Sequence, residues 1–241
     1  LIMLRHNIHH LAVIHRRRPI GVIRLEDVVR YETQSSLYLM DSIFSQDSVR
    51  GLATLLPDVR ASAVRMIREG ADSKTMSTAL SAVGRSFTRR LIELAEADLG
   101  PPPVAYAFMA MGSMARNEQT LVTDQDNALV LDDRFDPSAH DAYFLALAQR
   151  VSDGLDACGY AHCKGDIMAT NPQWRQPLSV WKQTFQSWIE APNPERLLHS
   201  NIFFDLDNVY GEERLVEQLQ ERVATQAGKS PAFLAAMARN A

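Results

Sequence analysis

The sequence predicts an α/β (α+β) protein: a sheet with flanking helices, preceded by a helical segment and by a β-hairpin with a short helix. Two observations carry this prediction. Short apolar runs typical of buried strands occur at residues 104–111 and 126–131. Around them, apolar residues recur at steps of three and four, which is the spacing of an amphipathic helix. Strands that alternate with helices are typical of an α/β domain, which we expect at about residues 104–215.

The composition is that of a folded globular chain, and it excludes several classes of protein. Of the 241 residues, 46% are hydrophobic and 22% are charged, which is too apolar for a disordered chain. The 25 basic and 29 acidic residues give a net charge of −4, which argues against binding a nucleic-acid backbone by charge. No apolar run approaches the roughly 20 residues that a membrane span needs.

The cysteines give a further limit. Cys158 and Cys163 are the only two, too few for a disulfide framework or for a zinc site of four thiolates. His162 lies between them, but Gly159 stands at the expected end of a helix, and we do not expect these residues to form a zinc cluster. Free thiols in this number are typical of a cytoplasmic protein, and that is the location we expect.

The N-terminal residues 11–32 form a compact unit of their own. Apolar runs at 11–14 and 20–23 predict two strands. The polar turn between them contains three arginines, residues 16–18, which we interpret as a solvated hairpin tip, with a phosphate-binding patch as the alternative. A helix is expected from residue 25, because acidic side chains in a first turn are favoured by the helix dipole.

A helical segment follows, and we place it at residues 33–102. Pro57 is expected to kink or divide a first helix, Gly70 to stop it, and Ser73 to cap the next one. That next helix carries a stripe of apolar residues and ends at Gly100 and three prolines. The stripe comprises Met76, Leu80, Val83, Phe87, Leu91 and Leu94. We interpret it as a core face, with a docking face for a partner as the alternative.

Further elements are expected after residue 126. Pro137 is expected to begin a helix that Gly159 closes. We expect additional strands at 160–168 and at 202–204, with a short helix from residue 193 between them. The three tryptophans, seven residues apart, are interpreted as core residues, with base stacking as the alternative; they are Trp174, Trp181 and Trp188.

The segment with the strongest functional signal is residues 111–126. Gly112 and Ser113 follow an apolar strand, where a glycine lets the backbone approach a phosphate and a helix N-terminus can donate hydrogen bonds to it. Asp124 and Asp126 stand two apart at the start of the next strand, so their carboxylates point to the same face. Two such oxygen ligands suit Mg²⁺, which takes the rest of its shell from water and substrate phosphates. The combination predicts a site for metal-assisted phosphate chemistry.

This combination resembles the nucleotidyltransferase superfamily of polymerase-beta type, and more closely the DUF294 nucleotidyltransferases, which are similar to the uridylyltransferase of the nitrogen regulatory protein PII. The matching motifs are at residues 112–120, 123–128, 168–175 and 202–205, and the likeness covers about residues 50–241. The resemblance implies a mixed sheet with flanking helices.

The N-terminal unit looks like the last part of a CBS domain, a module that commonly precedes this family. From the likeness we divide the chain into four parts. They are a CBS remnant at 1–32, the helical segment at 33–102, a nucleotidyltransferase-like domain at 103–215, and the start of a C-terminal helical region at 216–241.

The resemblance also implies roles for individual residues. Asp124 and Asp126 would hold magnesium, and Gly112 and Ser113 would hold a nucleoside triphosphate. Arg116 would contact a phosphate or pair with Glu118 or a nearby acid. A third catalytic carboxylate would come from Asp205, with Asp166 as the alternative.

The implied reaction transfers a nucleoside monophosphate from an NTP to an unknown protein or small-molecule acceptor. The alternative is a regulatory module linked to CBS domains that binds nucleotide without transferring it. We expect a homodimer with two-fold symmetry, the commonest closed symmetry.

Overall fold

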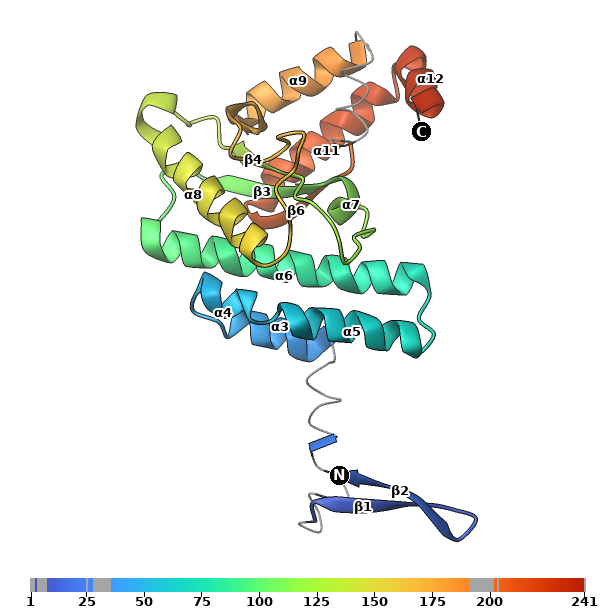
Figure 1. The fold of residues 1–241 in the computed structure, drawn as a ribbon. Helices are drawn as coiled ribbons and strands as arrows, with labels where there is room; N and C mark the ends of the chain where they lie inside the picture. Colours follow the sequence, from blue (N-terminus) through green and yellow to red (C-terminus); the bar gives the residue numbers. More distant parts are fainter. Residues whose placement is uncertain are drawn as a thin grey trace.

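A computed structural model describes residues 3, 8–24, 26–27, 36–190, 202 and 204–240. Figure 1 shows a body of helices around a central sheet and, apart from it, a two-stranded hairpin near the N-terminus. None of the helices in these ranges combines the length and the apolar composition that crossing a membrane requires.

The hairpin confirms the two N-terminal strands. Strand β1 (His10–His15) pairs antiparallel with strand β2 (Arg18–Arg24). Arg16 and Arg17 form the turn with φ values of 46° and 63°. A two-residue type I′ hairpin turn requires this left-handed conformation at both of its central residues. The helix expected after the hairpin lies mostly outside the described residues, in which only residues 26 and 27 are helical.

Within the described residues, the helical segment contains four helices. They are α3 (Ser36–Phe44), α4 (Val49–Ala53), α5 (Leu56–Arg68) and α6 (Ser73–Leu99). Pro57 stands in the first turn of α5, where its missing N–H costs no hydrogen bond, and so it divides the segment as expected. The cap of α6 is Asp72 rather than Ser73: the Asp72 carboxylate accepts a hydrogen bond from the Thr75 N–H at 2.7 Å. Either residue type is a good cap, and the extended backbone of Asp72 decides which one acts.

The central sheet has the strand order β5-β4-β3-β6. Strand β3 (Tyr106–Met111) lies antiparallel between β4 (Asn127–Leu131) and β6 (Leu206–Gly211), while β5 (Arg175–Pro177) pairs parallel with β4. The sheet is therefore mixed. Its two central strands are buried along their whole length, as their unbroken apolar runs predict.

Two expected strands are wrong. Residues 160–168 contribute an isolated bridge between Ala161 and Asp124 instead of a strand. The strand expected at 202–204 lies later, at Leu206–Gly211, while Ile202 is helical and Phe204 lies in a bend; Phe203 is outside the described residues. The short helix expected from residue 193 also falls outside them. The backbone groups of residues 160–169 bond to Gln125 and Asn127 instead of to a partner strand, and pairing with β3 begins only at Leu206.

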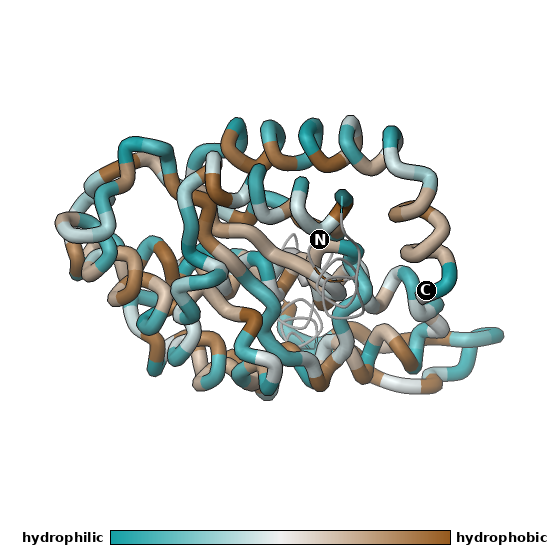
Figure 2. The backbone as a smooth tube through the Cα atoms, turned by 90° about the horizontal axis from the view of Figure 1, so that it is seen from above, coloured by the Kyte–Doolittle hydropathy of each residue, from teal (hydrophilic) through white to brown (hydrophobic). Residues whose placement is uncertain are grey.

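Helices cover both faces of the sheet (Figure 1). On one face lie α6 and α8 (Pro137–Ala157), with α3, α4 and α5 beyond α6; on the other lie α9 (Leu178–Glu190) and α11 (Glu213–Ala227). The C-terminal helix α12 (Pro231–Asn240) follows α11. In Figure 2 hydrophobic residues recur along the helices between hydrophilic ones, as expected for helices with one buried face.

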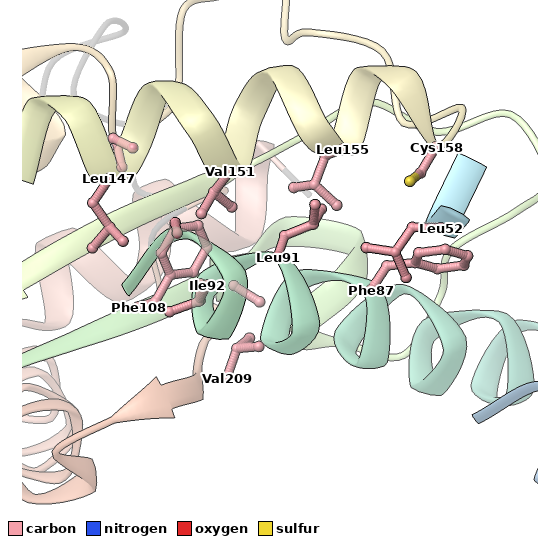
Figure 3. Packing of buried hydrophobic residues seen from close by; sticks show 14 of the residues in the cluster. Leu52, Phe87, Leu91, Ile92, Phe108, Leu147, Val151, Leu155, Cys158 and Val209 are labelled. Atoms are coloured by element: carbon pink, nitrogen blue, oxygen red, sulfur yellow. The ribbon is translucent and has the colours of Figure 1, made fainter. Parts of the chain in front are cut away.

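The α6 stripe is part of the core, which favours the first of its two interpretations. Leu80, Val83, Phe87 and Leu91 are buried in a cluster that also contains residues of α8 and β3. Figure 3 shows Leu147, Val151 and Leu155 of α8 pointing toward α6. The three tryptophans are likewise buried together on the opposite face of the sheet, with the Trp174 and Trp181 rings stacked at 6.1 Å. They are core residues.

Two tyrosines link the sheet to α6 by hydrogen bonds. The hydroxyl groups of Tyr106 in β3 and Tyr210 in β6 both donate to the carboxylate of Glu96, each at 2.7 Å. These charge-assisted hydrogen bonds fix the register of the helix over the two strands that lead to the candidate site.

Candidate functional site

The site begins at the turn that ends β3. Gly112 opens the short helix α7 (Gly112–Ala115) with a φ of +55°, a conformation that favours glycine. A Cβ atom on residue 112 would lie 3.1 Å from Asp126 Oδ2. The Met111 N–H donates to the Asp126 carbonyl at 3.1 Å, and the Gly112 N–H donates to the Asp205 carbonyl at 3.2 Å. The turn is therefore held directly between two segments that carry acidic side chains.

Side chains alternate along the segment before β4, as the sequence predicts. Gln125 is buried, and its amide donates to the carbonyls of Ser152 at 2.9 Å and Tyr160 at 2.8 Å. Its neighbours on either side point the other way: Asp124 is exposed and Asp126 is half-buried. The buried residue anchors the segment to the core, and the two carboxylates are presented together.

Asn127 continues the pattern and positions a distant loop. It is buried, and its side-chain oxygen accepts a hydrogen bond from the Ala169 N–H at 2.9 Å. Its own N–H donates to the Ile167 carbonyl at 3.2 Å. These two bonds hold the loop that carries Cys163 against the Asp124–Asp126 segment.

Three side chains converge at this place. The candidate ligand atoms of Asp124, Asp126 and Cys163 all lie within 4.8 Å of one another. The two carboxylates are the oxygen ligands that Mg²⁺ takes from proteins, and the missing Cβ of Gly112 leaves room beside one of them. The donor set and the space fit a divalent cation. Cys163 is the member that sequence reasoning missed, because it lies 37 positions after Asp126, and spacing within the motif could not reveal it.

The electrostatics of the group favour a cation. Burial is the main cause that raises the pKa of Asp126, and the charge of Asp124 raises it further; a hydrogen bond with Cys163 and the charge of Arg116 act in the opposite direction. Two neighbouring carboxylates, one of them desolvated, repel each other in the charged form. A bound cation would relieve that repulsion.

Arg116 pairs with acids in this structure. Its Nε lies 2.7 Å from Glu118, and its Nη1 lies 2.7 Å from Asp205. Of the two roles considered for Arg116, the structure therefore contains the pairing with acids. Its side chain is 39% exposed, so the guanidinium also borders solvent in front of the turn.

Neither of the two candidates for a third carboxylate belongs to the group of mutually close ligand atoms. Asp205 binds Arg116 and is not in the group of mutually close ligand atoms. Asp166 has a φ of +55°, and its carboxylate accepts from the Asn171 amide at 2.9 Å. Within the described part of the chain, the third member of the group is thus Cys163, and the catalytic role of Asp205 stays a prediction.

The remaining candidates contribute no ligands to this group. His162 lies 3.4 Å from Asp153 and 3.6 Å from Asp156, and Cys158 is buried at the end of α8. Ser113 is half-buried in the first turn of α7.

Arg85 holds the turn through a hydrogen bond, and no sequence pattern predicted this role. Its Nη2 donates to the Met114 carbonyl at 2.9 Å, and its Nη1 pairs with Asp207 at 2.7 Å. One side chain of α6 therefore contacts both α7 and the first half of β6. Asp205 stands directly before β6.

Comparison with known protein families places the site within a matched region. The family model described as "Putative nucleotidyltransferase DUF294" matches residues 57–195, more than half of the chain. The matched range contains the Gly112 turn, both aspartates and Cys163. It does not include the N-terminal hairpin. No curated protein matches the chain.

Proposed function

Because the chain belongs to the DUF294 family of nucleotidyltransferases, we propose that it transfers a nucleoside monophosphate from an NTP to an acceptor with the assistance of Mg²⁺. One observation carries the proposal: Asp124 and Asp126 lie side by side next to a turn whose glycine lacks the Cβ that would meet Asp126. A metal-binding pair beside a phosphate-accepting turn is what this transfer needs.

Each residue of the site has a proposed part. Asp124 and Asp126 would hold Mg²⁺, which when bound offsets the negative charge of the phosphates. Gly112 and Ser113 would receive the triphosphate, since a glycine lets a phosphate approach the backbone and the Ser113 hydroxyl can donate a hydrogen bond to it. The residues themselves bind and orient the substrate, so that the reacting atoms are held in line.

The atoms of the reaction balance as follows. An oxygen of the acceptor forms a bond to the α-phosphorus of the NTP. The bond from that phosphorus to the oxygen shared with the β-phosphorus breaks, and pyrophosphate leaves. The acceptor's proton passes to solvent or to a carboxylate, for which we propose Asp205.

Arg116 and Asp205 are paired with each other in the structure, and each also has a role in the proposed reaction. In the structure they bind each other at 2.7 Å. A phosphate would compete with Asp205 for the guanidinium, since Arg forms strong bidentate bonds with phosphate oxygens. Nucleotide binding would then free Asp205 to act in the site.

The same ion pair motivates a second candidate function. If Asp205 remained bound to Arg116, the site would have two carboxylates and no third, because Asp205 is outside the group of close ligand atoms. Such a site would bind nucleotide without transferring it, as a regulatory module does. Turnover separates the two functions.

The experiment uses the whole chain with each NTP in turn, labelled at the α-phosphate, with Mg²⁺ and with cell lysate as the source of acceptors. Nucleotide binding is measured in parallel by calorimetry. Release of pyrophosphate together with a labelled product supports the transferase. Nucleotide binding that needs Mg²⁺ but releases no pyrophosphate supports the regulatory module, and the absence of binding to any NTP contradicts both.

For partners, we propose a protein or small-molecule acceptor rather than nucleic acid, given the net charge of −4. We also propose a two-fold dimer. The α6 stripe cannot form it, because that stripe is buried in the core. The hairpin offers a surface instead, with Ile14, Ile20 and Val22 at least 60% exposed. Sedimentation at micromolar concentrations tests this: a mass of 27.0 kDa throughout would contradict a dimer.

A further inference from the structure

Cys163 is the residue of the site that the proposed function does not use. Its sulfur lies within 4.8 Å of a ligand oxygen of both Asp124 and Asp126, and its thiol is hydrogen-bonded with the Asp126 carboxylate. The side chain is half-buried, so it is neither a solvated surface thiol nor a core thiol such as Cys158.

The backbone around Cys163 is arranged toward its sulfur. Burial is the main cause that raises the pKa of the Cys163 thiol, and the backbone N–H groups of Ile167 and Gly165 act in the opposite direction, as donors to the sulfur do. The loop is held in that shape by the Asp166 N–H, which donates to the Cys163 carbonyl at 3.0 Å, and by the bonds from Asn127 to residues 167 and 169. A neutral thiol is a weak acceptor and gains little from two amide donors. A metal-bound thiolate gains much more, because outer hydrogen bonds orient and stabilise a metal ligand.

The distances suit one ion. Zinc binds sulfur at about 2.3 Å and carboxylate oxygen at about 2.0–2.2 Å in tetrahedral geometry, so two donors on the same zinc ion lie about 3.3–3.6 Å apart. The three donor atoms in the structure lie within 4.8 Å of one another, so side-chain rotations that move them closer by about 1 Å would bring them onto one centre. Asp124 is exposed, which leaves a side open to the ion.

We propose that Cys163 is a metal ligand that determines cation specificity, through which the Asp124–Asp126 site binds a thiophilic divalent cation such as Zn²⁺ more tightly than Mg²⁺. Sulfur ligands select such cations, whereas Mg²⁺ prefers oxygen alone. On binding, the S–H bond is replaced by a sulfur–metal bond, and the proton leaves to solvent. The proposed function and this cation specificity rest on the same two carboxylates, those of Asp124 and Asp126, and share nothing else. Zn²⁺ would compete with Mg²⁺ for the same two carboxylates.

The test uses Co²⁺ as a coloured substitute for Zn²⁺, added to the whole chain without nucleotide. Thiolate bound to Co²⁺ gives a charge-transfer absorption in the near ultraviolet that oxygen ligands do not give. We expect this absorption in the wild-type chain, saturating at one equivalent and bleached by Zn²⁺ at far lower concentration than by Mg²⁺. Asp126→Asn should weaken Co²⁺ binding at least about tenfold, as loss of a supporting group in a metal site commonly does.

The chain offers a matched control for the sulfur. Cys158 is its only other cysteine and is buried away from the group. Cys163→Ser should abolish the absorption, while Cys158→Ala should keep it. Absorption that persists in Cys163→Ser would overturn the proposal, as would Co²⁺ binding by the wild-type chain without any charge-transfer band.

A second measurement needs no variant. Alkylation of Cys163 in the wild-type chain, followed by peptide mass spectrometry, should be slowed by Zn²⁺ and not by Mg²⁺. Equal alkylation with and without Zn²⁺ would contradict the proposal. Because neither measurement requires turnover, a thiolate band without pyrophosphate release would refute the transferase and leave this inference standing, and turnover without the band would do the reverse.

Discussion

The carboxylate of Asp126 lies against Gly112: a Cβ atom on residue 112 would stand 3.1 Å from Asp126 Oδ2. This contact joins the two halves of the candidate site, the turn after β3 and the acidic pair before β4. The absence of a side chain at residue 112 therefore sets both the backbone conformation of the turn and the space beside the carboxylate.

Gly112→Ala is expected to impair the site beyond the cost of its backbone strain. Alanine at a positive φ costs about 1–2 kcal/mol, and here the new Cβ also displaces Asp126. Gly70→Ala is the matched control, since Gly70 has a φ of +81° and a Cβ atom there would meet nothing within 4 Å. We expect similar losses of unfolding free energy in both variants, measured in urea, but loss of nucleotide binding in Gly112→Ala alone. Equal nucleotide binding in the two variants would contradict the role of this contact.

Asp124→Asn and Asp126→Asn are expected to reduce Mg²⁺-dependent nucleotide binding at least about tenfold, because an amide keeps the shape of the side chain and loses the charge. Far-ultraviolet circular dichroism should be unchanged. Asp98→Asn serves as the control, since Asp98 is an exposed acid that pairs with Arg150 far along α6. Wild-type Mg²⁺ dependence in both site variants would refute the metal assignment.

The Arg116–Asp205 pair is expected to add little to stability. Its side chains are 39% and 42% exposed, and ion pairs of this exposure contribute at most about 1 kcal/mol. A double-mutant cycle with Arg116→Ala and Asp205→Ala, measured by urea unfolding, gives the coupling energy. Arg116→Ala should also weaken nucleotide binding, whereas Glu118→Ala should not. A coupling well above this bound would mean that the pair is structural and that the guanidinium is not available to a phosphate.

The pair of Arg175 and Asp141 is expected to behave differently, because the Arg175 side chain is 2% exposed. Its guanidinium also donates to the carbonyls of Ala169 and Thr170 at 2.7 and 3.1 Å, so it links α8 to the loop after Cys163. Asp141→Ala leaves that buried charge without its partner, and we expect a loss of about 1–3 kcal/mol in unfolding free energy. Asp98→Ala, which breaks an exposed pair with Arg150, should cost less than about 1 kcal/mol. Equal costs would contradict the importance of burial here.

Stability should depend on pH through the cap of α6. The backbone N–H of Thr75 is the main cause that lowers the pKa of Asp72. A carboxyl group whose pKa is lower in the folded chain stabilises that chain fully above its unfolded pKa, and the contribution is lost as pH falls through the folded pKa. Asp72→Asn keeps a capping oxygen without a charge. We expect the melting temperature of the wild-type chain to fall more than that of Asp72→Asn between neutral and acidic pH; parallel curves would contradict this.

Local patterns in the sequence predicted the parts of the fold that depend on neighbouring residues. The period of the α6 stripe, the proline that starts α8 and the unbroken apolar runs of β3 and β4 each describe one element, and each was confirmed. The alternation of Asp124, Gln125 and Asp126 is local as well, because successive side chains of an extended segment point to opposite faces. For the same reason, the Gly112 turn could be singled out from its position between two strands.

Only the tertiary structure decided which distant residues meet. Arg175–Pro177 is too short and too polar to predict as a strand, yet it pairs with β4 because the loop before it is held by Asn127 and by its own buried arginine. Residues 160–168 look like a strand but form a loop, since Gln125 and Asn127 take the hydrogen bonds of that loop with their side chains and backbone. That loop brings Cys163 to Asp126, and the bend after residue 203 turns Asp205 toward Arg116. The sequence alone therefore predicted that Asp124 and Asp126 lie side by side. Which groups surround them is decided by long-range packing, and a local sequence pattern carries no information about that packing.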